Sequence, residues 1–247
     1  MRISFLFQLK ENKLPKDYRR GFASLIKHAI SKADPQLYDI YYTGKHKIKP
    51  FTFSVYFPQQ PKLQDDYFLV GDRAILNIST NDYRFASQLY NGMLSILNSS
   101  YPLFDNSVTL RTFNYHPLKK IKRDEVIFKT IDAMLITNKY CHIDVDGNQY
   151  DLYLTPEEDG FDEGLKFLVK EMVKRFLNYE GDFLFEYELI KNSVRAIPIW
   201  HYNQWNKGIK GQIRIKSHPE ILQLIYDIGI GARRSQGFGM LEVANER

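Results

Sequence analysis

The sequence predicts an α+β protein in which one β-α-β-β-α-β unit occurs twice. Segments with the two-residue period of strands and the 3.6-residue period of helices follow one another in the same order in both halves of the 247-residue chain. A basic stretch without any period separates the halves. Hydrophobic residues make up 44% of the chain, which is enough to build a core and excludes an intrinsically disordered protein.

The first half begins with a strand and an amphipathic helix. Residues 2–9 (RISFLFQL) alternate in part between apolar and polar side chains. From Tyr18 to Ile30 the apolar residues recur at helical spacing, and we expect Asp17 to cap this helix and Pro35 to stop it. The elements that follow are strands at 50–57, 74–79 and 108–115, with a helix opened by Asp82 before the last strand.

Residues 117–123 (PLKKIKR) are basic and aperiodic, so we expect one domain over residues 1–118 and a second over residues 124–247. Ser217 and Glu220 have the spacing of a capping box for a helix in the second half. The elements expected there are strands at 126–136, 150–154, 184–198, 209–216 and 239–244, and helices over 165–176 and 221–228. Each half therefore has the ferredoxin-like (RRM-like) order of elements.

Positive charge is concentrated near the N-terminus. The net charge is +5, yet residues 1–60 alone carry eleven Lys or Arg against four Asp or Glu, which indicates a polyanionic partner such as nucleic acid. The single cysteine, Cys141, excludes a disulfide framework and a cysteine-rich zinc site. No segment has the pattern of a signal peptide or the length of a membrane span. We expect a cytoplasmic protein that uses no metal, cofactor or membrane.

The strongest local motif is the loop GIGARRSQGFG at residues 229–239. Glycines permit positive φ and a close approach of backbone to ligand, successive N–H groups can bind an anion, and arginines can make bidentate phosphate contacts. The loop follows a helix and enters a strand, which is the reverse of a dinucleotide-binding fingerprint. We expect phosphate binding here, with a glycine-capped connection as the structural alternative. The residues concerned are Gly229, Gly231, Arg233, Arg234, Gly237 and Gly239.

Three segments of the chain resemble one known family. The glycine-rich loop with its following strand is similar to that of the CRISPR-associated RAMP proteins. HKIKPFTFS, residues 46–54, resembles a block in which a histidine and a lysine precede a Phe-Thr-aromatic-Ser strand, and LIKHAI, residues 25–30, resembles a segment of the first helix. Together they resemble the Cas6 family, endoribonucleases that process precursor CRISPR RNA.

The resemblance implies metal-independent cleavage of CRISPR repeat RNA. In that reaction a 2′-hydroxyl attacks the adjacent phosphorus and leaves a 2′,3′-cyclic phosphate and a 5′-hydroxyl. The resemblance assigns proton transfer to His46, charge stabilisation to Lys49 and a second proton transfer to His28. An imidazole suits proton transfer near neutral pH, and neighbouring ammonium groups favour its neutral form. Further residues expected to contact RNA, besides those of the loop, are Lys27, Lys45 and Lys47.

The first helix departs from the family pattern. Some members carry a catalytic tyrosine in the segment where this chain has Lys27 and His28. Tyr38, Tyr41 and Tyr42 are other sources of a hydroxyl. Two other functions stay open: a non-catalytic RNA-binding subunit that holds guide RNA, and a nucleotide-binding enzyme that uses the glycine loop for pyrophosphate. The sequence also leaves open a homodimer and docking on a CRISPR effector complex.

Overall fold

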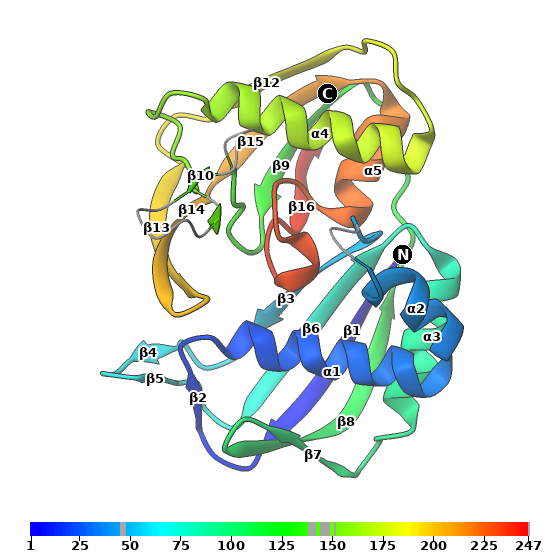
Figure 1. Ribbon diagram of the computed structural model, residues 1–247, viewed down its shortest axis with the longest axis vertical. Coiled ribbons are helices and arrows are strands. Elements are labelled where there is room, and N and C mark those ends of the chain that lie inside the picture. The colour runs from blue at the N-terminus through cyan, green and yellow to red at the C-terminus, as the bar shows by residue number, and fades with distance from the viewer. Residues whose placement is uncertain (45–47, 138–141, 144–148, 151, 247) are drawn as a thin grey trace. The chain divides into compact units, whose positions relative to one another are not determined.

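The computed structural model describes residues 1–44, 48–137, 142–143, 149–150 and 152–246 (Figure 1). Contacts between residues group the chain into two compact units. The first unit holds residues 1–118 together with two short segments, 201–203 and 235–237, and the second unit holds the remainder.

The first unit is built on a five-stranded antiparallel sheet with the strand order β3-β6-β1-β8-β7. Helices α1 (Tyr18–Ala33) and α3 (Tyr83–Leu94) pack together beside the sheet, and α2 (Pro35–Tyr42) follows α1 (Figure 1). If the additional edge strand β7 is left out and the other four strands are numbered by their order in the chain, their order across the sheet is 4-1-3-2, as in the ferredoxin-like fold. The strands are β1 (Arg2–Leu9), β3 (Phe51–Tyr56), β6 (Arg73–Thr80), β7 (Ser100–Leu103) and β8 (Asn106–His116), and a separate small sheet contains β2 (Lys13–Pro15), β4 (Lys62–Leu63) and β5 (Tyr67–Leu69).

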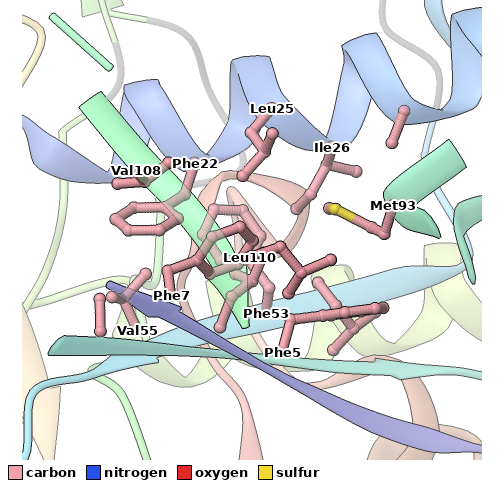
Figure 2. Close-up of a cluster of buried hydrophobic side chains, with 14 of the residues drawn as sticks. Phe5, Phe7, Phe22, Leu25, Ile26, Phe53, Val55, Met93, Val108 and Leu110 are labelled. Carbon is pink, nitrogen blue, oxygen red and sulfur yellow. The ribbon is translucent and has the colours of Figure 1, made fainter. Parts of the chain in front are cut away.

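The core of the first unit follows from the two periods in the sequence. Phe5 and Phe7 alternate along β1 and are fully buried, and Phe22 and Ile26 face them from α1 (Figure 2). Helix α3 comes unusually close to α1, because a Cβ at Gly92 would lie 2.0 Å from a backbone oxygen of α1. A glycine is therefore required at the crossing of the two helices.

The second unit repeats this topology. Its strand order is β12-β15-β9-β16, which is again 4-1-3-2 across the sheet when the strands are numbered by their order in the chain. Its core includes Phe128, Leu165 and Ile225, all 0–1% exposed. The strands are β9 (Glu125–Thr130), β12 (Phe185–Leu189), β15 (Gln212–Ser217) and β16 (Leu241–Glu246), the helices are α4 (Phe161–Leu177) and α5 (Pro219–Ile228), and η1 (Arg234–Gln236) is a short 3-10 turn. Two hairpins are added, β10 (His142–Ile143) with β11 (Gln149–Tyr150) and β13 (Arg195–His201) with β14 (Gln204–Lys210).

Two of the expected helix caps are wrong, and one helix was not expected. Helix α1 ends at Ala33, so it stops before Pro35 as expected. The unexpected feature is α2, which begins at Pro35 because proline is tolerated at the first position of a helix; the Asp34 carboxylate accepts a hydrogen bond from the Leu37 N–H at 2.9 Å. Asp17 precedes α1 but its side chain caps no backbone N–H. Ser217 ends β15 and donates to the carbonyl of Leu184, so no capping box opens α5.

Candidate functional site

Two lysine side chains face one tyrosine ring in the first unit. The Nζ of Lys27, on α1, lies 5.3 Å from the centre of the Tyr42 ring, and the Nζ of Lys49, just before β3, lies 5.0 Å from the same centre. An ammonium group within about 6 Å of a ring centre is attracted to its π face. Tyr42 ends α2, so three separate elements converge here. We call Lys27, Tyr42 and Lys49 the lysine–tyrosine cluster.

The Tyr42 hydroxyl is held in its neutral form. Burial raises the pKa of Tyr42 above its ordinary value, and the nearby hydroxyls of Tyr38 and Tyr41 add to the shift. Tyr38 stacks on the ring, with centroids 5.1 Å apart. At neutral pH the Tyr42 hydroxyl can therefore donate a proton. Tyr41 has a structural contact instead, because its hydroxyl donates to Asp82 and its ring packs on Phe85.

Three of the expected site residues, Lys45, His46 and Lys47, lie outside the described residues. In the sequence, His46 is four residues after Tyr42 and three residues before Lys49, both of which belong to the lysine–tyrosine cluster. Three residues of extended chain span at most about 11 Å.

His28 faces a different partner from its neighbour Lys27. The half-buried His28 ring lies 5.1 Å from the Tyr101 ring of β7, at an angle of 51°. Burial raises the pKa of Tyr101, and a hydrogen bond with Ser24 partly offsets this shift. Adjacent positions on a helix point about 100° apart, so Lys27 reaches the lysine–tyrosine cluster while His28 packs against an edge strand. Lys27 and Lys49 thus share the Tyr42 ring as a partner, whereas His28 contacts Tyr101.

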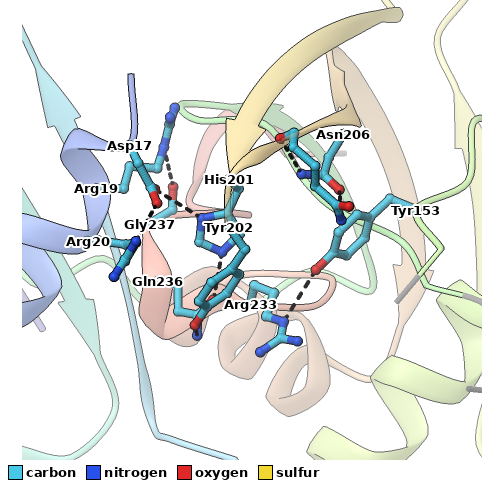
Figure 3. Close-up of polar contacts among 11 residues, drawn as sticks. Asp17, Arg19, Arg20, Tyr153, His201, Tyr202, Asn206, Arg233, Gln236 and Gly237 are labelled. Carbon is cyan, nitrogen blue, oxygen red and sulfur yellow. Dashed lines mark hydrogen bonds and ion pairs between the residues drawn. The ribbon is translucent and has the colours of Figure 1, made fainter. Parts of the chain in front are cut away.

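A buried polar cluster lies beside the start of α1 (Figure 3). His201 is 1% exposed; its Nδ1 lies 3.4 Å from a carboxylate oxygen of Asp17, and its Nε2 lies 2.9 Å from the side-chain oxygen of Gln236. The Gln236 amide donates to the Tyr202 hydroxyl, and Arg20 bonds to Asp17 at 3.3 Å. Because its ring is enclosed, His201 positions the chain and is not accessible to a ribose.

Sequence reasoning missed this polar cluster. Asp17 and its partner His201 are 184 residues apart in the sequence, so no local pattern links them. The single local signal is an acidic residue at the start of a helix, and this signal predicted a cap that does not form.

The glycines of the loop at 229–239 permit close contacts within the protein's own backbone. A Cβ at Gly239 would lie 1.9 Å from the Ile230 carbonyl oxygen, and a Cβ at Gly231 would lie 2.6 Å from that of Leu135. Both glycines have positive φ, +70° and +90°. The N–H groups of Ile230, Ala232 and Gly239 donate to protein carbonyls at 2.7–2.9 Å. These three groups therefore do not form the open anion-binding nest that the sequence suggested.

The two loop arginines have different environments. Arg234 is 7% exposed and donates to the carbonyl of Ile228 at 3.0 Å, and burial lowers its pKa to about 10. Its guanidinium is engaged inside the loop, contrary to the expectation of a phosphate contact. Arg233 has an exposed side chain and donates to the Tyr153 hydroxyl at 3.3 Å (Figure 3). A phosphate contact from this loop would depend on Arg233.

The described residues form neither a metal-binding cluster nor a helix that could span a membrane. No group of three or more His, Cys, Asp or Glu side chains among them is arranged to hold a metal ion. None of the helices they form is long and apolar enough to cross a membrane.

Comparison with known proteins identifies the relatives of this chain. Residues 116–243 match the family model "CRISPR associated protein Cas6, C-terminal". A "CRISPR-associated endoribonuclease Cas6" from Pyrococcus furiosus is 24% identical over 250 residues, covering 95% of this chain and 85% of that protein. The family model thus covers the second half of the chain, and the Pyrococcus furiosus relative aligns with nearly all of it.

Solved structures share the whole fold. A Cas6-related protein from Pyrococcus furiosus superposes with a TM-score of 0.82 at 18% identity, covering 100% of this chain and 99% of that one. A protein described as an RAMP protein binding different RNA substrates gives 0.81 at 17% identity, covering 99% and 100%. A structure described as CRISPR associated protein Cas6 gives 0.74 at 24% identity, covering 99% of each chain. With the family model matching more than half of its residues, the chain belongs to the Cas6 family.

Proposed function

We propose that this protein is an endoribonuclease that cuts CRISPR repeat RNA in precursor transcripts without a metal ion. Residues 1–118 carry the cleavage site, and residues 124–247 carry a loop that holds the RNA backbone. Family membership supports an RNA-processing role, and the curated relative from Pyrococcus furiosus is named as an endoribonuclease. The lysine–tyrosine cluster is the observation that carries the proposal, because it supplies two cations and a proton donor, and two of its members, Tyr42 and Lys49, flank His46 in the sequence.

The reaction needs two proton transfers and one stabilising charge. A base takes the proton of the 2′-hydroxyl, and the oxygen attacks the adjacent phosphorus. The bond from phosphorus to the 5′-oxygen breaks, and an acid gives that oxygen a proton. The products are a 2′,3′-cyclic phosphate and a 5′-hydroxyl, and the negative charge that develops on the phosphoryl oxygens needs a nearby cation.

We assign these roles to named residues. His46 exchanges protons with the ribose, because an imidazole titrates close to neutral pH. Lys49 meets the developing charge, with Lys27 beside it over the same ring. The resemblance gave the second proton to His28, whereas the geometry favours Tyr42, whose hydroxyl stays protonated at neutral pH and whose ring faces both ammonium groups. Outside the cluster, the exposed Arg233 contacts the RNA backbone.

The decisive experiment is cleavage of repeat RNA by the purified protein in EDTA. We expect a 5′-hydroxyl product, and we expect a 2′-deoxy substitution at the cleavage position to block the reaction. His46→Ala should abolish cleavage and keep binding. Lys49→Ala should slow the single-turnover rate by about 10²–10³-fold, the typical effect of removing one group that stabilises the transition-state charge.

Lys62→Ala is the matched control, because Lys62 is an exposed lysine of β4 in the same unit. Its rate should equal that of the wild type. Tight binding of the repeat with no cleavage would favour the alternative function, a subunit that holds RNA without cutting it. Cleavage that stops in EDTA and returns with added magnesium would contradict metal independence.

A further inference from the structure

A pocket of about 230 Å³ lies in the first unit between the first half of α1 and the end of β7. The helix contributes Arg20, Gly21 and Ser24, and the strand side contributes Tyr101, Leu103 and Phe104. None of these residues belongs to the lysine–tyrosine cluster or to the glycine-rich loop. The volume suits a ligand of the size of a nucleobase.

Phe104 stands at the rim of the pocket in an unfavourable backbone conformation. Its φ is +58°, in the left-handed region that Gly, Asn and Asp adopt most easily and bulky residues rarely do. The residue is nevertheless 45% exposed, so core packing does not explain why an aromatic residue occupies this turn. A residue that conflicts with its local backbone and gains little burial indicates a functional contact of its side chain.

The remaining lining supplies polar groups beside this ring. The Arg20 side chain is 52% exposed, and its bond to Asp17 uses one of five guanidinium N–H donors. Ser24 and Tyr101 share a hydrogen bond at the wall. Gly21 lies directly under the turn, where a Cβ would come within 2.5 Å of the Phe104 ring. The pocket thus combines an aromatic face, two hydroxyls and one cation.

This combination is the chemistry that recognises a nucleotide. A base stacks on an aromatic ring, hydroxyls bond to the base edge or the ribose, and a guanidinium binds phosphate. Arg20, Ser24 and His28 are spaced four residues apart and share one face of α1, and Lys27 lies only about 4.5 Å further along the helix axis than Ser24. The pocket is therefore next to the proposed cleavage site.

We propose that this pocket binds one unpaired nucleotide of the RNA substrate, close to the scissile linkage. The inference rests on the proposed function and adds a position at which base identity is selected. Phe104 stacks on the base, Arg20 binds its phosphate, and the hydroxyls of Ser24 and Tyr101 bond to the base edge or sugar.

The test combines two measurements on the full chain. First, the four ribonucleoside 5′-monophosphates are titrated into isotope-labelled protein, and we expect the amide signals of Ser24 and Tyr101 to shift with at least one of them. Inorganic phosphate is titrated in parallel. Second, the affinity for repeat RNA and the rate of its cleavage are measured for Phe104→Asn, which removes the ring at a backbone position that asparagine adopts easily.

We expect Phe104→Asn to unfold at or above the wild-type temperature and to weaken binding of the monophosphate and the RNA by at least about fivefold. Tyr83→Ala, which removes a 65% exposed aromatic ring from α3, should leave both affinities unchanged. If wild-type protein binds and cuts RNA while Phe104→Asn behaves identically, the pocket proposal is overturned and the proposed function stands. Shifts caused equally by inorganic phosphate would also overturn it.

A protein that neither binds nor cuts RNA would overturn the proposed function instead. In that case, shifts of Ser24 and Tyr101 with a monophosphate, lost in Phe104→Asn, would still support a nucleotide site in this pocket.

Discussion

Tyr42 has two properties that substitution can separate, a ring that two ammonium groups face and a hydroxyl that stays protonated at neutral pH. Tyr42→Phe keeps the ring and removes the hydroxyl. If the hydroxyl protonates the leaving 5′-oxygen, we expect the single-turnover rate to fall by about 10²-fold, within the usual range for a general acid. RNA affinity should not change, because both lysines keep their aromatic partner.

The pH profile gives a second readout for Tyr42. The cleavage rate should rise with pH as the imidazole that acts as base loses its proton. Burial raises the pKa of Tyr42 above the ordinary value of about 10, so the acid stays protonated and the plateau should extend past pH 9. A rate that declines between pH 8 and 9 would contradict Tyr42 as the proton donor.

His28 provides the complementary test, because its ring contact can be kept while its proton chemistry is removed. His28→Phe preserves an aromatic side chain against Tyr101. We expect the cleavage rate to stay within about threefold of wild type, since the geometry gives the second proton to Tyr42. A loss of about 10²-fold or more would return that role to His28. The thermal unfolding temperature, measured for the same variant, controls for a packing defect.

At the scale of elements, the loop at 229–239 is held by its own backbone. Gly239→Ala would bring a Cβ to 1.9 Å from the Ile230 carbonyl oxygen at a φ of +70°, so we expect the free energy of unfolding to fall by about 2–4 kcal/mol. Denaturant unfolding measures this. Gly181→Ala is the control, because its Cβ would meet only the hydroxyl end of the exposed Tyr179 side chain. Lower RNA affinity with unchanged stability in Gly239→Ala would contradict the structural role.

The two loop arginines should respond in opposite ways. Arg233→Ala removes an exposed guanidinium, and we expect weaker RNA binding with unchanged stability. Arg234→Ala leaves the Ile228 carbonyl without the buried donor, and we expect a loss of about 1–3 kcal/mol in the free energy of unfolding. Filter binding and thermal melts on both variants separate the effects. Equal effects of the two substitutions on RNA binding would show that both side chains contact the RNA.

The elements that sequence reasoning predicted well are those with a strong local period. The strand at 2–9, the helix from Tyr18 and the Asp82 cap, whose carboxylate accepts from the Phe85 N–H at 3.0 Å, all have a signal within a few residues. Helix α2 was missed because Pro35 was taken as a stop, although proline suits the first turn of a helix equally well. The hairpin β13–β14 was missed because its strands were merged with their neighbours.

The site was only partly predictable for a related reason. Lys27 and Lys49 could be named from the sequence, but their common partner Tyr42 could not be chosen among three neighbouring tyrosines. The choice depends on which face of α2 packs inward. Tyr41 points to Asp82 and Phe85, and this orientation leaves Tyr42 for the lysines. Such rotational placement is set by tertiary contacts, which a linear pattern does not contain.

At the scale of the whole molecule, the charge distribution makes a prediction about salt. Residues 1–60 carry more positive charge than the chain's whole net excess, the remainder being slightly negative, and Lys27 and Lys49 belong to this section. Each phosphate that a lysine neutralises on single-stranded RNA adds about 0.7 to the magnitude of the slope of log affinity against log salt concentration. If both lysines contact the RNA backbone, the double variant Lys27→Ala/Lys49→Ala should show a slope smaller in magnitude by about 1.4.

A matched double variant separates local contacts from the general effect of net charge. Lys166→Ala/Lys170→Ala also removes two positive charges, but these lysines lie on α4 and pair with Asp162 and Asp182. A long-range field would weaken RNA binding similarly in both variants, whereas direct phosphate contacts reduce the salt slope only in the first. Equal slopes for the two double variants would falsify the placement of RNA on the lysine–tyrosine cluster. A reduced slope in the first alone, together with loss of cleavage in Lys49→Ala, would locate binding and chemistry at the same three side chains.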